Sequence, residues 1–412
     1  MTPARSLTRR DVLAAGAAAM AASCIGGAAT RDAPPIRTIT RGPKFHWFGY
    51  YDKLQFDPTG RYVLGMEVDF EHRTPRGDDE IRVGMIDLKD GDRWIELGRS
   101  RAWGWQQGCM LQWRPGSKSQ VVWNDRQDGR FVCHVLDVKT GKKRTIGHAI
   151  YTLSPDGRTA ASADFARIQA CRPGYGYAGL TDAHANQEAP ATSGVFRIDL
   201  TSGKSDLIAS LADIVTLDPA TVRKGVGRQW VNHLLFAPDG KRLVFLHRCR
   251  GMHTRMITIA PDGSAPYVLE PGGRMSHFIW RDATHILGWT RPRGKATGYW
   301  LLTDRTQEVR QIGRKAMPHN GHVTYLPGNT WILNDTYPQG RERKQHLYLY
   351  HTADNRVVTL GRFHSPPKYR GEWRCDLHPR SSRDGRAITI DSPHTGKGRQ
   401  IHLIDISRTV TA

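Results

Sequence analysis

One short turn recurs seven times along the chain, and its spacing constrains the fold more than any other feature. The clearest copy is Phe236-Ala237-Pro238-Asp239-Gly240. Three of the spacings between successive copies are 40, 44 and 45 residues, which is the length of one four-stranded blade of a β-propeller. The seven copies open at Phe56, Trp113, Leu153, Phe236, Trp280, Tyr325 and Ser381.

Each turn is followed by a run of alternating or β-branched residues, such as Arg61–Met66 and Lys241–Leu246, and then by a second run of the same kind. This period-2 pattern with turn residues between runs is typical of strands and not of helices. We therefore predict an all-β chain, a seven-bladed β-propeller that forms one domain over residues 31–412. In the last blade we expect strands at Glu372–His378, Ala387–Asp391 and Ile401–Ile406, with Pro35–Thr40 as the missing outer strand that closes the ring.

The N-terminus carries the pattern of an export signal. Arg9-Arg10 precedes an apolar, alanine-rich stretch that ends near Ala22, as in twin-arginine signal peptides. We expect residues 1–30 to be removed and the mature protein to be periplasmic or secreted, with a lipid anchor at Cys24 as an alternative. The five cysteines beyond Cys24 lack paired spacing, so the sequence does not predict a disulfide framework.

The formal net charge is +21, and such a surface attracts polyanions. For an exported protein we expect an acidic polysaccharide or oligosaccharide as the partner, not nucleic acid, and no segment after the signal is long and apolar enough to span a membrane. The sequence indicates no oligomeric state. Arginines gather in the loops between the second and third strands of the predicted blades, where they match carboxylate or sulfate groups; Arg248 and Arg291 are two of them.

Four histidines share one register. His233, His277, His322 and His378 each lie three residues before a turn copy, so the propeller would place them at one height around its axis. Imidazole is the commonest protein ligand for transition metals. We predict a divalent metal site here, with zinc or manganese favoured over calcium, which prefers oxygen ligands.

A long insertion follows the third turn copy. Its segment Asp164–Gly179 places two arginines before alternating glycine and tyrosine. Arg172, Tyr175 and Tyr177 would give this loop cationic and aromatic groups that suit a sugar. The alternative is a loop that only covers a blade edge.

Three segments, Phe45–Lys53, Arg167–Gly179 and Arg374–Arg380, resemble those of bacterial seven-bladed propeller polysaccharide lyases. The resemblance is to the ulvan lyases and L-rhamnose-α-1,4-D-glucuronate lyases, and more distantly to oligogalacturonate lyase. It implies that a tyrosine and an arginine sixteen residues apart carry out the elimination, as Tyr151 and Arg167 are spaced. It also implies a manganese ion held by histidines. Where the ulvan lyases have histidines in the second blade, this chain has Gln106, Gln107 and Asn124 as expected substrate contacts, which favours the rhamnose–glucuronate branch.

The expected reaction removes the C5 proton of a uronic acid and expels the group on O4. Arg167 would neutralise the carboxylate beside C5 by bidentate pairing. Tyr151 would act as base or acid, provided that nearby arginines lower its pKa. His72 and His233 are the candidate partner bases.

Two other functions fit the sequence. A glycoside hydrolase needs paired carboxylates, and Asp52, Asp125, Asp164 and Asp376 lie near predicted strand ends. A non-catalytic propeller that binds a polyanion or a protein is the second. Because the candidate loops are dominated by arginine, we favour the lyase.

Overall fold

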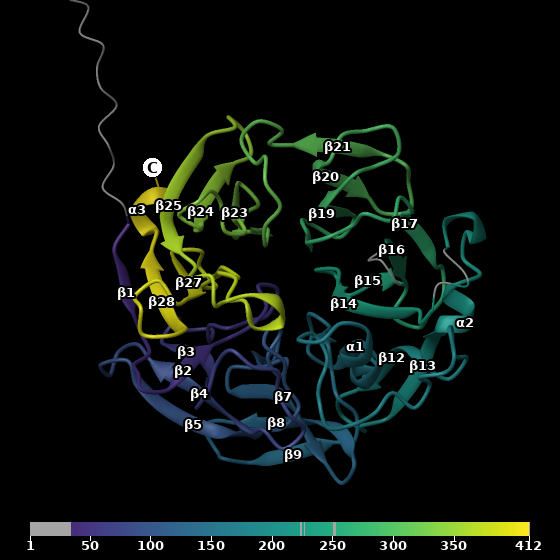
Figure 1. The fold of residues 1–412 in the computed structure, drawn as a ribbon, viewed down its shortest axis with the longest axis horizontal. Coiled ribbons are helices and arrows are strands. Elements are labelled where there is room, and N and C mark those ends of the chain that lie inside the picture. The colour runs from purple at the N-terminus through teal and green to yellow at the C-terminus, as the bar shows by residue number, and fades with distance from the viewer. Residues whose placement is uncertain (1–33, 223–224, 226, 250–252, 412) are drawn as a thin grey trace, which may run out of the picture. The chain divides into compact units, whose positions relative to one another are not determined.

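Seven four-stranded antiparallel sheets follow one another around a ring in the computed structural model of the chain, which describes residues 34–222, 225, 227–249 and 253–411 (Figure 1). The seven-bladed β-propeller predicted from the turn spacing is therefore confirmed. The predicted signal peptide, residues 1–30, and Cys24 lie outside the described residues.

The first four blades occupy the N-terminal half of the ring. Each blade runs in chain order from an inner to an outer strand. Their strands are β2 (Phe45–Trp47), β3 (Tyr62–Val68), β4 (Ile81–Asp87) and β5 (Arg93–Ser100); β6 (Gln112–Trp113), β7 (Gln120–Gln127), β8 (Arg130–Asp137) and β9 (Lys143–Ile146); β10 (Thr152–Leu153), β11 (Thr159–Ala163), β12 (Gly194–Asp199) and β13 (Ser205–Ser210); β14 (Trp230–Phe236), β15 (Leu243–Arg248), β16 (Thr254–Ile259) and β17 (Tyr267–Glu270).

The remaining blades close the ring. Blades five and six are built like the first four, whereas the outer strand of the seventh comes from the start of the described chain. Their strands are β18 (Phe278–Trp280), β19 (His285–Thr290), β20 (Gly298–Thr303) and β21 (Val309–Ile312); β22 (Thr324–Tyr325), β23 (Trp331–Asp335), β24 (Lys344–His351) and β25 (Val357–His364); β26 (Arg380–Ser381), β27 (Ala387–Ser392), β28 (Gln400–Asp405) and β1 (Ile36–Thr38).

Closure by the N-terminal strand is also confirmed, because β1 pairs with β28 in the register Ile36↔Ile404 to Thr38↔His402. One strand of that blade was predicted wrongly. Residues 371–373 form a 3-10 turn, and the inner strand begins only at Arg380. No strand is assigned to the described segment between them, which contains Asp376 and His378.

The recurring turn has a backbone reason. Gly240 and Gly385 adopt φ values of +73° and +71°, a left-handed conformation that glycine reaches without strain. Asp239 and Asp384 next to them accept a hydrogen bond from the backbone N–H two residues on, at 3.0 and 3.1 Å. This local geometry turns the chain from one strand into the next, so the motif marks the same place in each blade.

Short helices occur mainly in the insertions. They are α1 (Phe165–Cys171), α2 (Leu211–Ile214), α3 (Ser407–Val410) and the 3-10 turns η1 (Pro219–Thr221) and η3 (Gly371–Trp373). None of these described helices is long and apolar enough to cross a membrane. Cys109, Cys133, Cys171 and Cys375 carry free thiols.

Candidate active site

A cavity of about 410 Å³ opens near the ring centre, between the third-blade insertion and blades four to six. None of its described lining residues is acidic, and three are arginines. Such a lining favours an anionic ligand, because each guanidinium can donate two parallel hydrogen bonds to a carboxylate. The lining residues are Arg172, Tyr175, His233, Arg248, His253, Thr254, Gly272, Gly273, Arg274, Met275, Ser276, His277 and Tyr337.

Tyr175 is the most unusual titratable group at this cavity. Its hydroxyl oxygen accepts a hydrogen bond from Arg374 Nη2 at 2.7 Å and lies 3.5 Å from Arg172 Nη2. Burial alone would raise the pKa of Tyr175, but the positive charges of Arg374 and Arg172 outweigh it and lower the pKa to about 7. A tyrosine in this state is partly ionised at neutral pH and can act as a general base.

The glycine-rich sequence of the insertion explains how Tyr175 reaches this position. Helix α1 begins at Phe165, capped by Asp164, whose carboxylate accepts from the backbone N–H of Arg167 at 3.0 Å. After the helix, Gly174 has φ +90°. It lies so close to Glu372 that a Cβ atom added at Gly174 would be 2.9–3.3 Å from atoms of Glu372. This close approach brings the loop against residues 371–374 and so places Tyr175 beside Arg374.

Arg248 is the buried arginine of the cavity. Burial and the neighbouring charge of Arg172 lower the pKa of Arg248 to about 10, which leaves the side chain cationic at neutral pH. Arg274 also lines the cavity and is exposed. Sequence reasoning identified Arg172, Tyr175 and Arg248 but missed Arg274 and Arg374, because neither lies in the loop position that we searched.

Three of the four histidines that share one register gather at one place. The ring centroids of His277 and His322 are 4.2 Å apart, and so are those of His322 and His378. Tyr50 lies between this group and His233, with its ring 4.9 Å from His233 and 5.1 Å from His378. His233 is therefore separated from the other three and faces the cavity together with His277.

The best metal-binding geometry among the described residues uses two of the predicted histidines and a carboxylate. Ligand atoms of His322, Asp376 and His378 all lie within 4.8 Å of one another, and the three residues are buried. The sequence contained a signal for Asp376 that we used only for the hydrolase hypothesis. Asp376 is two residues from His378 in the sequence, and the left-handed backbone of His378, with φ +42°, was not predictable from that spacing.

These residues fit a divalent cation. The Nδ1 of His322 lies 3.0 Å from both carboxylate oxygens of Asp335, an arrangement that leaves Nε2 for a metal. The Nε2 atoms of His322 and His378 are buried and have no hydrogen-bond partner among the described residues. Burial and the neighbouring His322 hold the pKa of His378 well below its ordinary value, so the ring is neutral, as a ligand must be.

Arg167, predicted to neutralise the substrate carboxylate, has no donor to spare. Its five N–H groups are directed at Asp182 and at four backbone carbonyl oxygens, and its side chain is 1% exposed. The guanidinium therefore ties the insertion to the start of β14, and Arg248 and Arg172 are better placed for the substrate. The acceptors are Gln229 O, Asp182 Oδ2, His184 O, Gln187 O and Glu188 O, at 2.6–3.1 Å.

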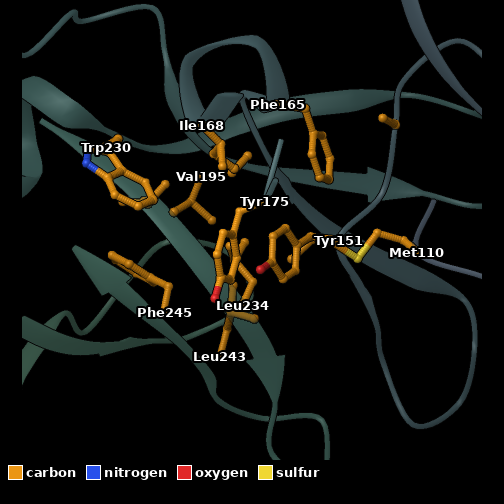
Figure 2. Close-up of a cluster of buried hydrophobic side chains, with 14 of the residues drawn as sticks. Met110, Tyr151, Phe165, Ile168, Tyr175, Val195, Trp230, Leu234, Leu243 and Phe245 are labelled. Carbon is orange, nitrogen blue, oxygen red and sulfur yellow. The ribbon is translucent and has the colours of Figure 1, made fainter. Parts of the chain in front are cut away.

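Tyr151, predicted as the acid or base, is fully buried and does not line the cavity. Its hydroxyl donates to Gln107 Oε1 at 2.7 Å, and burial raises its pKa above the ordinary value of 10.0. Figure 2 shows Tyr151 and Tyr175 in one buried cluster with Phe165 and Ile168 of α1. The condition set for Tyr151, a pKa lowered by arginine, is met by Tyr175 instead.

Most other predicted contacts stabilise the scaffold. Gln106 donates to the carbonyl oxygens of Glu372 and Arg374. Asn124 and Tyr177 are fully buried and hydrogen-bonded to each other at 2.9 Å.

His72 and Arg291 are not among the described residues that line the cavity. The ring of His72 instead packs 4.7 Å from that of Tyr369, and Arg291 is exposed. Neither is therefore placed to act on a ligand in this cavity.

The carboxylates considered for a glycoside hydrolase do not form a pair at the cavity. Asp52 binds Lys53 at 2.9 Å, Asp125 lies 3.2 Å from His134, and Asp164 caps α1. Asp376 accepts from Arg374 Nε at 2.6 Å. The arrangement does not provide the two facing carboxylates of that reaction.

Comparison with known proteins supports the fold. No protein-family model and no curated protein matches the sequence. An oligogalacturonate lyase in complex with manganese superposes with a TM-score of 0.67 at 15% identity, over 92% of this chain and 95% of its own. Oligogalacturonate lyase from Vibrio parahaemolyticus gives 0.66 at 14%, over 91% and 94%. An acylaminoacyl peptidase gives 0.52 at 14%, over 87% of this chain but 51% of its own. At these identities the likeness shows a shared propeller fold.

Proposed function

We propose that this protein is a polysaccharide lyase that cleaves a uronate-containing glycan by β-elimination. The observation that carries the proposal is Tyr175, held between Arg374 and Arg172 at the edge of a cavity lined by arginines. The oligogalacturonate lyases that share the fold over nearly their whole length add support. The net charge of +21 suits an acidic glycan, and the Arg9-Arg10 signal suits an exported enzyme that meets one.

In the proposed reaction, Arg172, Arg248 and Arg274 bind the uronate carboxylate and neutralise its charge, which makes the C5 proton easier to remove. Ionised Tyr175 takes that proton, and the C5–H electron pair forms the C4=C5 double bond. The C4–O4 bond breaks, and O4 leaves with the bonding pair. Tyr175 then returns the proton to O4, so the enzyme ends as it began.

His322, Asp376 and His378 would hold a divalent cation beside this cavity. When bound, such an ion supplies Lewis acidity toward a carboxylate or a sugar oxygen. Two imidazoles and one carboxylate suit manganese or zinc, and manganese is present in one of the structurally similar lyases.

A screen of acidic oligosaccharides tests the proposal. Oligogalacturonate, rhamnose–glucuronate oligosaccharides and other uronates are incubated with the protein, with and without Mn²⁺ or Zn²⁺. The ultraviolet absorbance of the conjugated double bond and the product mass identify elimination. We expect an unsaturated product from at least one uronate, and the rhamnose–glucuronate linkage is the one favoured by the sequence. Binding without product on every uronate would support the non-catalytic propeller instead.

A further inference from the structure

Strand β14 is interrupted at His233, and the interruption sets the direction of the His233 side chain. The pairing of β14 with β15 runs to Asn232↔Leu246, shifts register and resumes at Leu235↔Val244. At the shift, His233 has φ +52°, a conformation that a non-glycine residue adopts only when its surroundings enforce it. Bulges of this kind redirect side chains beside functional sites.

Two buried side chains hold His233 at this bulge. The hydroxyl of Tyr151 donates to Gln107 Oε1 at 2.7 Å. The Gln107 Nε2 lies 3.2 Å from His233 Nδ1. Tyr151, Gln107 and His233 thus form a chain of two hydrogen bonds, and their exposed fractions are 0%, 2% and 6%.

The orientation of the Gln107 amide sets the direction of each hydrogen bond in this chain. Among the described residues the buried Tyr151 hydroxyl has Gln107 Oε1 as its acceptor, so the carbonyl oxygen of Gln107 faces Tyr151. The amide nitrogen of Gln107 then faces His233 Nδ1 and donates to it. A neutral imidazole carries one proton, and with Nδ1 accepting, that proton is on Nε2.

We propose that Tyr151 and Gln107 are positioning residues that hold His233 as the Nε2–H tautomer, so that it meets a ligand in the cavity as a hydrogen-bond donor. This inference rests on the proposed lyase function and adds a role for His233 to it. Nδ1 is taken by Gln107, and Nε2, which lies 3.5 Å from the Tyr50 hydroxyl, is the nitrogen left for substrate. His233 then stabilises the departing O4 by a hydrogen bond, and proton abstraction belongs to Tyr175.

The tautomer can be read without any substrate. Nitrogen-15 NMR of the mature protein with labelled histidine rings distinguishes a protonated from a bare ring nitrogen, and the His233 signals are assigned by their loss in His233→Gln. We expect a protonated Nε2 and a bare Nδ1 in the wild type. A proton on Nδ1 in the wild type would overturn the proposal, because Gln107 would then present its oxygen.

Two near-isosteric variants sharpen the test. Gln107→Glu puts a carboxylate beside Nδ1 and should move the proton from Nε2 to Nδ1, whereas Gln107→Leu removes the donor and should leave a mixture of tautomers. Tyr348→Phe is the matched control, since it deletes one buried hydroxyl that is hydrogen-bonded to Asn334 at 2.7 Å in blade six; its His233 spectrum should equal the wild type. An unchanged tautomer in both Gln107 variants, with circular dichroism showing a folded protein, would refute the role of Gln107.

Kinetics separates this inference from the proposed function. With an active substrate, Gln107→Glu should lower kcat by about 10- to 100-fold with KM nearly unchanged, because only a transition-state contact is lost. If no uronate is cleaved but the ring proton of His233 moves as expected in the Gln107 variants, the positioning role is supported and the proposed lyase function is refuted. If turnover occurs and Gln107→Glu leaves kcat unchanged, the lyase stands and the donor role of His233 fails.

Discussion

The Nη2 atom of Arg374 lies 2.7 Å from the hydroxyl oxygen of Tyr175, although 199 residues separate them in the chain. The contact joins the third-blade insertion to the segment that leads into blade seven, across the centre of the ring. Arg374 also binds Asp376 at 2.6 Å. One guanidinium therefore links the candidate base to the candidate metal ligands.

Replacing Tyr175 by phenylalanine should lower kcat by about 10²–10⁴-fold, the usual contribution of a general acid–base group. Substrate binding should persist, because the arginines of the cavity remain. Steady-state kinetics with a cleaved uronate and calorimetric titration with a non-cleavable analogue measure the two effects. The control is Tyr348→Phe, which should retain wild-type turnover; a Tyr175→Phe enzyme with normal kcat would assign the base elsewhere.

The activity should rise as the pH increases through about 7. The pKa of Tyr175 is lowered to about 7, so the hydroxyl is protonated and inactive as a base below that pH and ionised above it. Arg374→Gln removes the larger of the two stabilising charges and should move the midpoint of the kcat/KM profile upward by roughly 1–3 pH units. Arg274 lines the cavity, whereas the described arginines that contact the Tyr175 hydroxyl are Arg172 and Arg374, so Arg274→Gln should raise KM and leave the midpoint in place. A midpoint that stays near 7 in Arg374→Gln would argue against Tyr175 as the titrating base.

Metal binding should depend on His322, Asp376 and His378. Purified protein incubated with Mn²⁺ or Zn²⁺ should retain about one ion per chain after desalting, if the three residues act as ligands. A concentration 100-fold above Kd stabilises the fold by about 2.7 kcal/mol, so chelation should lower Tm. His378→Ala and Asp376→Asn should lose the ion and the response to chelator, whereas His351→Ala, whose ring pairs with the exposed Asp354, should keep both. Full activity in metal-free protein would show that the ion has no catalytic part.

The architecture was predictable because the turn chemistry repeats. Six of the seven turn copies contain at least two of three residues, a proline, an aspartate and a left-handed glycine, and the strand pattern needs no long-range information. Even closure by Ile36–Thr38 followed from counting strands in the last blade. The inner strand of that blade was misplaced, since Glu372–His378 alternates like a strand but lacks a pairing partner.

The site was predictable only in part. Loop composition identified Arg172, Tyr175 and Arg248, and the shared register identified the histidines. The sequence could not show that the N–H donors of Arg167 already make hydrogen bonds within the protein. Four of the acceptors are backbone carbonyls, which have no sequence signature. Nor could it show which tyrosine lies between two arginines, since Arg374 comes from a distant blade.

Arg167 should prove to be a stability residue. Arg167→Ala leaves the carboxylate of Asp182, whose side chain is 1% exposed, without its buried partner, and it removes the guanidinium donors from four backbone carbonyls. Breaking a buried pair in this way costs about 3–5 kcal/mol, which urea denaturation followed by tryptophan fluorescence would detect. Arg228→Gln is the matched control, because Arg228 contacts the same carboxylate at 3.4 Å from a position that is 33% exposed, and such pairs contribute about 0–1 kcal/mol. A stable Arg167→Ala protein with normal unfolding but lost substrate binding would return Arg167 to the role of carboxylate ligand.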